Sequence, residues 1–264
     1  MDETPIKTEL TDLDKIIGGL YPGEILLIGS RPTIGKSSLI RTLIKKVTIE
    51  KGIKSLLFSL EIPKPLFQMS IVVSLSGIST WKILLQKLEE EELKIYNMFL
   101  SQVEDLPIII DDTENNNIND ICNMSRKLVK EEGIEIIYLD YLGLITINEE
   151  NPSIEDFCTE VMTKLKGLAR ELNIPIVLAC QVSRTPEHIS MRGICHSSII
   201  DNSDVILLLD RKRNYSENPI FYFAHLDIVK NNYGDTGGFK LRFIPESGCF
   251  ENLPLPMKKI MDCR

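Results

Sequence analysis

The segment Gly29-Ser30-Arg31-Pro32-Thr33-Ile34-Gly35-Lys36-Ser37-Ser38 decides the fold of this chain. It follows a short apolar run at 25–28 and precedes a segment, 39–44, with the periodicity of a helix. A strand, a turn that contains glycine and a Lys-Ser pair that opens a helix form the layout of a phosphate-binding loop. The first turn of a helix carries unpaired N–H groups and the positive end of the helix dipole, so it attracts anions. We therefore predict a nucleotide phosphate site here.

Three residues of this segment have distinct expected roles. Gly35 lets the backbone approach a phosphate closely, because glycine has no Cβ. Lys36 supplies positive charge to the outer phosphates, and the hydroxyl of Ser37 is suited to bind Mg²⁺. The position that usually holds the first glycine of such a loop is occupied by Ser30, with Gly29 one residue earlier.

Composition indicates a globular protein and argues against several classes. The chain has 264 residues, of which 43% are hydrophobic and 26% charged, enough for one large domain or two small ones. A net charge of -8 argues against non-specific nucleic-acid binding by the whole surface, although not against a local basic channel. The six cysteines contain no Cys-x-x-Cys pair and the three histidines lack metal-ligand spacing, so no disulfide framework or zinc site is expected. No apolar run approaches the ~20 residues that span a bilayer, and the acidic N-terminus is unlike a signal peptide, so we expect a cytoplasmic protein without a membrane partner.

Short apolar runs alternate with helical segments along most of the chain. The expected strands lie at 24–28, 53–60, 106–110, 134–139, 174–180 and 205–209. This alternation predicts an α/β fold, a mainly parallel twisted sheet flanked by helices. Segments 220–230 and 237–245 are typical of longer strands around a turn, which predicts a C-terminal antiparallel hairpin. We expect a single domain over 1–264, made of a leading segment 1–22, a core 23–210 and the hairpin with C-terminal strands 211–264.

Capping residues and glycines set the expected helix boundaries. Thr11 offers an N-cap to a short helix that Gly18 ends, and Asn117 offers one to a helix that Gly133 closes. Residues 182–204 are expected to form a loop. Further helices are expected from the phosphate loop to about residue 50 and at 66–76, 79–88, 89–103 and 153–172.

Polar side chains follow several of the apolar runs. Ligands of parallel sheets bind at the carboxyl ends of the strands, and Glu61, Asp111, Asp140 and Gln181 fall at this edge with the phosphate loop. Any one of them could be a simple turn residue, but four at one edge favour a site. Asp140 is suited to hold Mg²⁺, Glu61 to orient or deprotonate an attacking water, and Gln181 to sense the γ-phosphate. Asp111 is the weakest candidate, because Asp111-Asp112-Thr113 is also typical of a turn.

Several blocks, in order over essentially the whole chain, resemble the C-terminal ATPase domain of DnaB-type replicative helicases, which has a RecA-like fold. Residues 31–37 are similar to the family's phosphate loop, which also lacks the usual first glycine. Ser59-Leu60-Glu61 resembles the block with the catalytic glutamate, Leu139-Asp140-Tyr141-Leu142 a later block, and Gln181-Val182-Ser183-Arg184 the sensor strand. The resemblance implies ATP and Mg²⁺ as cofactors, with Glu61, Lys36 and Gln181 catalytic and Ser37 and Asp140 at the metal. The nucleotide-binding residues that it implies are Arg31, Pro32, Thr33, Ile34, Gly35, Lys36, Ser37, Ser38 and Lys230.

Departures from the family pattern bear on function. The family hairpin reads Lys-x-Arg-x-Gly, and its basic pair is thought to reach the γ-phosphate of the neighbouring subunit; here Lys230 is kept, but Asn232 stands at the arginine position. An arginine finger is worth on the order of 10³-fold or more in rate, so weak activity is expected of this chain alone. The loop after Asp140 is acidic, where a DNA-facing loop would carry lysines and arginines. The family's N-terminal helical domain and linker helix do not fit into the few residues before Thr11.

Two main functional interpretations stay open. The first is Mg-ATP hydrolysis by a helicase-like motor domain that acts on single-stranded DNA in a homo-oligomeric, hexameric ring with other replication proteins. The second is a divergent paralogue that binds ATP with little hydrolysis and serves as an accessory factor in replication or plasmid maintenance. The retained Glu61 favours the first, because a protein that only binds ATP needs no carboxylate to orient water. A third interpretation, a RecA-like recombinase or clock-type ATPase, shares the core but fits the hairpin and leading segment less well.

Overall fold

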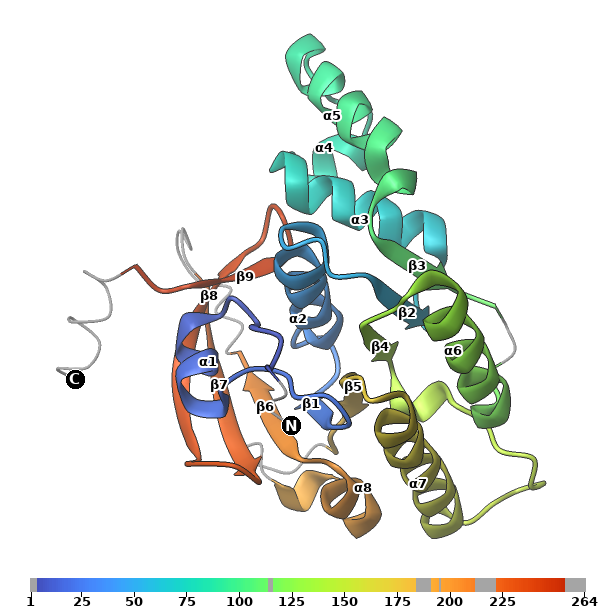
Figure 1. Ribbon diagram of the computed structural model, residues 1–264. Helices are drawn as coiled ribbons and strands as arrows, with labels where there is room; N and C mark the ends of the chain where they lie inside the picture. The colour runs from blue at the N-terminus through green and yellow to red at the C-terminus, as the bar shows by residue number, and fades with distance from the viewer. Residues whose placement is uncertain (1–3, 114–115, 184–190, 195, 212–221, 255–264) are drawn as a thin grey trace, which may run out of the picture.

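A single sheet organises the chain. The computed structural model describes residues 4–113, 116–183, 191–194, 196–211 and 222–254. Its 9-stranded sheet has the order β3-β2-β4-β5-β1-β6-β7-β8-β9 (Figure 1). Strands β1 to β6 pair in parallel, and β7, β8 and β9 continue the sheet in antiparallel pairing. The predicted α/β fold with a C-terminal antiparallel hairpin is confirmed.

The parallel strands are short and nearly all buried, as expected where helices cover both faces of a sheet. Their bounds are β1 (Ile25–Ser30), β2 (Ser55–Ser59), β3 (Ile108–Asp111), β4 (Ile136–Asp140), β5 (Ile176–Gln181) and β6 (Val205–Asp210). The antiparallel strands are β7 (Tyr222–Asn231), β8 (Gly237–Ile244) and β9 (Cys249–Asn252). β7 and β8 form the hairpin predicted from the two strand-like segments 220–230 and 237–245 around a turn.

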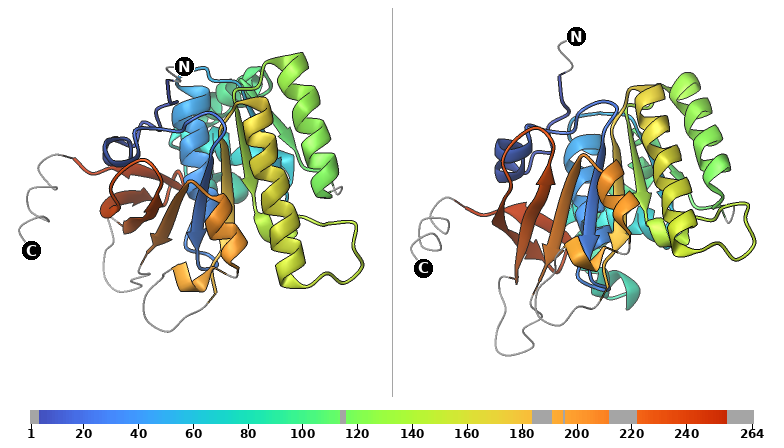
Figure 2. Two further views of the ribbon diagram at one scale, coloured as in Figure 1. Left: turned by 60° about the horizontal axis from the view of Figure 1, so that its bottom comes forward. Right: turned by 90° about the horizontal axis from the view of Figure 1, so that it is seen from below.

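Helices cover both faces of the parallel part. Helices α6, α7 and α8 pack on one face and α1, α2 and α3 on the other, and Figure 2 shows α6 and α7 side by side along the strands. α2 continues directly into a π-helical segment, Ile44–Ile49. The helix bounds are α1 (Thr11–Ile17), α2 (Lys36–Leu43), α3 (Lys64–Ser76), α4 (Thr80–Leu84), α5 (Glu90–Gln102), α6 (Ile118–Glu132), α7 (Ile154–Leu172) and α8 (Ser197–Asn202).

The alternation of side chains along β1 places the phosphate loop on a rigid support. Ile25 and Leu27 belong to the core under α6 and α7, whereas Leu26 and Ile28 belong to the core under α2. All four are at most 4% exposed, and complete burial of such a side chain stabilises the fold by about 1.5–3 kcal/mol. The loop after Ser30 therefore leaves a strand that is fixed from both sides.

Some expected boundaries are wrong. Thr11 is the first residue of α1 rather than its cap; the preceding turn is instead held by Asp14, whose carboxylate accepts from the backbone N–H groups of Thr8 and Glu9. α4 ends at Leu84, earlier than expected, and Gln86 then adopts a positive φ of 53°. The expected loop 182–204 contains α8. By contrast, Asn117 caps α6 and Gly133 ends it, as predicted. In the part of the chain that is described, no helix is long and apolar enough to cross a bilayer.

Candidate functional site: a phosphate loop at the carboxyl edge of the sheet

The turn between β1 and α2 has the geometry of a phosphate loop. Gly35 is the N-cap of α2 with a φ of 125°, a conformation that residues with side chains rarely adopt. A Cβ at this position would also lie only 3.2 Å from the ring of Phe250. The backbone conformation thus favours glycine, and a larger residue would also require the ring of Phe250 on β9 to shift by a few tenths of an ångström. The N–H groups of the first turn of α2 have no partners within the helix and face the carboxyl edge of the sheet.

Lys36 is held rather than free in solvent. It is only 7% exposed, and its Nζ lies 5.2 Å from the centre of the Tyr141 ring, which follows β4. A buried ammonium needs an anionic or aromatic partner, and phosphate oxygens would supply one. The other predicted nucleotide-binding residues of this segment lie in the same turn or at the start of α2: Arg31, Pro32, Thr33, Ile34, Ser37 and Ser38.

Asp140 faces this turn from the end of β4. Its carboxylate is hydrogen-bonded with Ser37 and feels the charge of Lys36, and its Oδ1 is buried without a hydrogen-bond partner. Burial raises the pKa of Asp140, while the Ser37 hydrogen bond and the Lys36 charge oppose this shift. An orphaned buried carboxylate oxygen beside a serine hydroxyl fits Mg²⁺, which binds through one or two protein oxygens, water and substrate phosphates. Among the described residues, no cluster of three or more His, Cys, Asp or Glu could hold a metal ion.

Glu61 and Gln181 join this group, and Asp111 does not. Glu61 is exposed just after β2, and the N–H of Leu60 donates to the carbonyl of Asp140 over 3.0 Å, which fixes the turn beside β4. The charge of Glu61 contributes to the raised pKa of Asp140, so the two carboxylates are neighbours. Gln181 pairs in register with Ser30 at the ends of β5 and β1. The Asp111 carboxylate accepts from the N–H of Thr113 over 2.9 Å. Asp111 therefore stabilises a turn, which was the alternative to a role in the site.

A brace from the C-terminal strands was missed from the sequence. Thr42 Oγ1 accepts from the N–H of Phe250 over 2.8 Å and donates to the carbonyl of Ser38 over 2.8 Å. Arg41 Nη2 donates to the carbonyl of Gly248 over 2.6 Å. These bonds join α2 to the turn before β9 and to β9 itself, so the last strand of the sheet fixes the helix that follows the phosphate loop. The contacts join residues more than 200 positions apart, and no local pattern reports them.

Lys230 and Asn232 lie at the opposite edge of the sheet. Lys230 pairs in register with Ile206 near the start of β6, and its Nζ donates to the carbonyl of Ile200 over 2.8 Å. Asn232 donates through its backbone N–H to the carbonyl of Asp204 over 3.0 Å. A strand of the length of β1 spans about 20 Å, so Lys230 cannot touch a nucleotide at the phosphate loop of its own chain. The prediction that Lys230 binds nucleotide therefore applies only to the phosphate loop of another chain.

Comparison with known proteins identifies this arrangement. The model of the DnaB-like helicase C terminal domain family matches residues 5–252. The chain belongs to this family. The replicative DNA helicase DnaB of Treponema pallidum (strain Nichols) is 33% identical over 248 residues, which are 92% of this chain and 55% of that protein. DnaB of Geobacillus stearothermophilus is 30% identical over 262 residues, 95% of this chain and 57% of that protein. The chain therefore spans about half the length of these relatives.

Solved structures show the same fold. A solved ATPase domain of another protein matches with a TM-score of 0.86 at 25% identity, covering 95% of this chain and 92% of that one. A DnaB-like replicative helicase, described with its interactions with primase, matches with a TM-score of 0.86 at 24% identity, covering 96% of this chain and 64% of that one. The predicted RecA-like fold and the resemblance to DnaB-type ATPase domains are thus confirmed.

Proposed function

We propose that this chain is the ATP-binding and ATP-hydrolysing motor domain of a DnaB-like replicative helicase. Its cofactors are ATP and Mg²⁺, and hydrolysis drives movement along single-stranded DNA in a homo-oligomeric ring with other replication proteins. The observation that carries the proposal is the meeting of Lys36, Ser37, Asp140 and Glu61 at one edge of the sheet. Buried polar atoms normally have a hydrogen-bond partner, but Oδ1 of Asp140, beside the phosphate loop, has none. A bound ligand would explain this, whereas a packing role alone would not.

The roles of the residues follow from their positions. Lys36 and the N–H groups of the first turn of α2 bind the phosphates. Ser37 and Asp140 would hold Mg²⁺, which would neutralise charge on the phosphate oxygens. Glu61 orients a water and accepts its proton as the water oxygen bonds to the γ-phosphorus. The bond from that phosphorus to the β–γ bridging oxygen breaks, which leaves ADP and inorganic phosphate. Gln181, at the end of the neighbouring strand, senses the γ-phosphate through a hydrogen bond from its side-chain amide.

Release of phosphate from Mg-ATP tests this function. We expect turnover that requires Mg²⁺ and stops when the metal is chelated, with no turnover in a Lys36→Ala chain purified in the same way. Hydrolysis that is equal in the two proteins would place the activity in a contaminant or at another site and would overturn the assignment.

The second candidate, an accessory factor that binds ATP with little hydrolysis, is favoured by one observation. Asn232 carries no charge at the position where the family hairpin has arginine, and its N–H is bound within its own chain. Such a factor would bind Mg-ATP tightly and show no stimulation of turnover by DNA. Binding of single-stranded DNA also separates the two. The acidic loop after Asp140 predicts poor binding by the isolated chain at physiological salt, and tight binding with a steep salt dependence would contradict that interpretation.

A further inference from the structure

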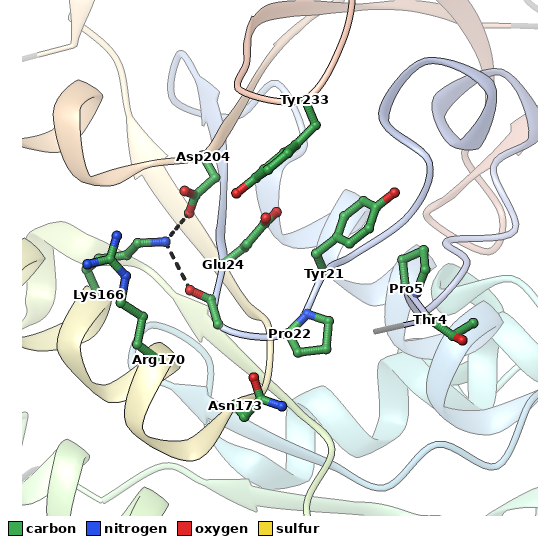
Figure 3. Close-up of a pocket in the computed structure, with 11 residues that line it drawn as sticks. Thr4, Pro5, Tyr21, Pro22, Glu24, Lys166, Arg170, Asn173, Asp204 and Tyr233 are labelled. Carbon is green, nitrogen blue, oxygen red and sulfur yellow. Dashed lines mark hydrogen bonds and ion pairs between the residues drawn. The ribbon is translucent and has the colours of Figure 1, made fainter. Parts of the chain in front are cut away.

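A cavity lies at the amino edge of the sheet, away from the phosphate loop. It has a volume of about 710 Å³, and its lining includes Glu24 before β1, Asn173 before β5 and Asp204 before β6. The hairpin turn contributes Tyr233, whose ring stacks on Tyr21 with 5.6 Å between ring centres. Figure 3 shows Lys166 and Arg170 entering the same cavity from one helix, α7. The cavity thus combines the hairpin turn with two cations from α7.

Of the four charged side chains that line this cavity, Glu24, Lys166 and Asp204 are bonded within their own chain. Lys166 Nζ donates to Asp204 Oδ2 over 2.6 Å and to the carbonyl of Gly23 over 2.9 Å (Figure 3). Asn232 Nδ2 donates to Asp204 Oδ1 over 3.3 Å. The phenol of Tyr233 is hydrogen-bonded with Glu24, which raises the pKa of that tyrosine to about 12 and keeps it protonated. These groups have little left to offer to a ligand.

Arg170 is the exception. It is exposed at the C-terminal end of α7, and its guanidinium makes no hydrogen bond or ion pair with any residue in the described part of the chain. Its charge nevertheless acts on Tyr233, so it lies near the hairpin turn. The guanidinium stays charged at every pH of interest and can form two parallel hydrogen bonds with phosphate oxygens. Arg170 is therefore an exposed cation without a partner in the described part of the chain, close to the hairpin turn where the charge of an arginine finger is missing.

We propose that Arg170 supplies in trans, to the ATP bound by a neighbouring copy of this chain, the positive charge that Asn232 cannot supply. This inference rests on the proposed function, because it needs a ring in which chains repeat head to tail. Such a ring joins two different faces, so the phosphate-loop edge of one chain meets another face of the next. Arg170 cannot serve its own loop, since the cavity lies at the far end of β1, a strand that spans about 20 Å. It stabilises charge on the γ-phosphoryl oxygens of the neighbour as the bond to the bridging oxygen breaks.

Mixing two defective chains tests this proposal with Mg-ATP as the probe. Arg170→Ala removes the cation and keeps the phosphate loop, whereas Lys36→Ala removes the loop lysine and keeps Arg170. We expect each variant alone to lose at least tenfold in turnover at high protein concentration, and we expect the mixture to exceed both. Recovery on mixing requires the two residues to act from different chains. A merely structural role of Arg170 would give none.

A second variant moves the charge instead of removing it. Arg170→Ala combined with Asn232→Arg is expected to regain turnover, and Arg170→Ala alone should keep its melting temperature and its affinity for a fluorescent ATP analogue. Arg126→Ala, which removes an exposed arginine on α6 bonded to Glu171, is the matched control and should hydrolyse ATP normally. Turnover that Arg170→Ala leaves unchanged would overturn this proposal and leave the ATPase function standing. A loss that neither mixing nor the moved charge repairs would also overturn it, and a wild-type chain without turnover would contradict both proposals.

Discussion

The side-chain amide of Asn232 donates a hydrogen bond to Oδ1 of Asp204, and the N–H of Asn232 donates to the carbonyl of the same residue. Oδ2 of Asp204 in turn accepts from Lys166 and from the N–H of Ile25, the first residue of β1. One carboxylate therefore joins the turn of the hairpin to the strand that leads into the phosphate loop. The hairpin position that carries arginine in the family is used here for a contact within the chain.

Asn232→Arg is expected to raise the ATPase rate of concentrated protein. The new guanidinium adds positive charge on the face that we propose meets a neighbour in a head-to-tail ring. We expect a gain of roughly tenfold rather than the ~10³ of a complete arginine finger, because Arg170 already supplies part of the charge. Asn232→Gln keeps an amide without charge and should show no gain. Equal rates for the arginine variant and wild type at high concentration would mean that the hairpin does not reach a neighbour.

Lys36→Ala is expected to abolish measurable ATP binding. Lys36 is a buried positive charge at the phosphate loop, and a charge-assisted contact with phosphate cannot be replaced by a methyl group. Isothermal calorimetry with Mg-ATP measures the effect. Lys46→Ala, which removes a lysine from the π-helical segment after α2, is the control and should bind normally. Unchanged affinity in the Lys36 variant would show that nucleotide binds elsewhere.

Glu61→Gln is expected to leave Mg-ATP binding intact and to reduce turnover by about 10²–10⁴-fold, the usual contribution of a general base. The amide can still hydrogen-bond water but cannot accept its proton. Asp111→Asn removes a second acid at the same sheet edge, one that only caps the turn at Thr113, and should hydrolyse ATP at the wild-type rate. If the Glu61 variant turns over normally, another residue activates the water.

Asp140→Asn is expected to stabilise the protein without nucleotide while weakening its response to Mg²⁺. Burial raises the pKa of Asp140 in the folded chain, so the free energy of unfolding falls as pH rises from the unfolded pKa to the folded one. The variant lacks this loss, and its melting temperature at neutral pH should exceed that of wild type, by about 2–4 °C for each 1 kcal/mol. The difference should vanish at a pH below both pKa values. A lower melting temperature at pH 7 would mean that the Ser37 and Lys36 contacts outweigh burial.

Lys166→Met is expected to lower the free energy of unfolding by about 3–5 kcal/mol, because it leaves the buried Asp204 carboxylate without its cation. Both side chains of this pair are at most 10% exposed. Arg126→Ala breaks the exposed ion pair with Glu171 and should cost less than about 1 kcal/mol. Urea titration of the two variants compares them directly. A cost as small as that of Arg126→Ala would show that the amino edge tolerates an unpaired carboxylate.

Features with a local signature were predictable from the sequence. Apolar runs bounded by turns located β1 to β6, and the residues at their ends located Glu61, Asp140 and Gln181 at the edge where the phosphate loop lies. Asn117 and Gly133 marked the ends of α6, because capping depends on neighbours only a few residues away.

Features that depend on distant contacts were not predictable. The brace between Thr42 and Phe250 joins α2 to β9, and the amino-edge network joins Asp204 to Lys166, 38 residues earlier. Threonine is a favoured N-cap residue, which is why Thr11 was predicted to cap α1. In the structure the turn before α1 is held by Asp14 instead. Arg170 lies in a stretch, residues 168–172, that resembles the family, but no role was predicted for it from the sequence, and it became a candidate only when the fold placed it beside the hairpin turn.

The most direct test of the motor assignment is the rate of phosphate release per chain across a range of protein concentrations at low salt, with and without single-stranded DNA. We predict a rate that rises with concentration as rings assemble, increases further with DNA, and is absent in Lys36→Ala. A rate per chain that is independent of both concentration and DNA, or no Mg²⁺-dependent release at any concentration, would contradict the account.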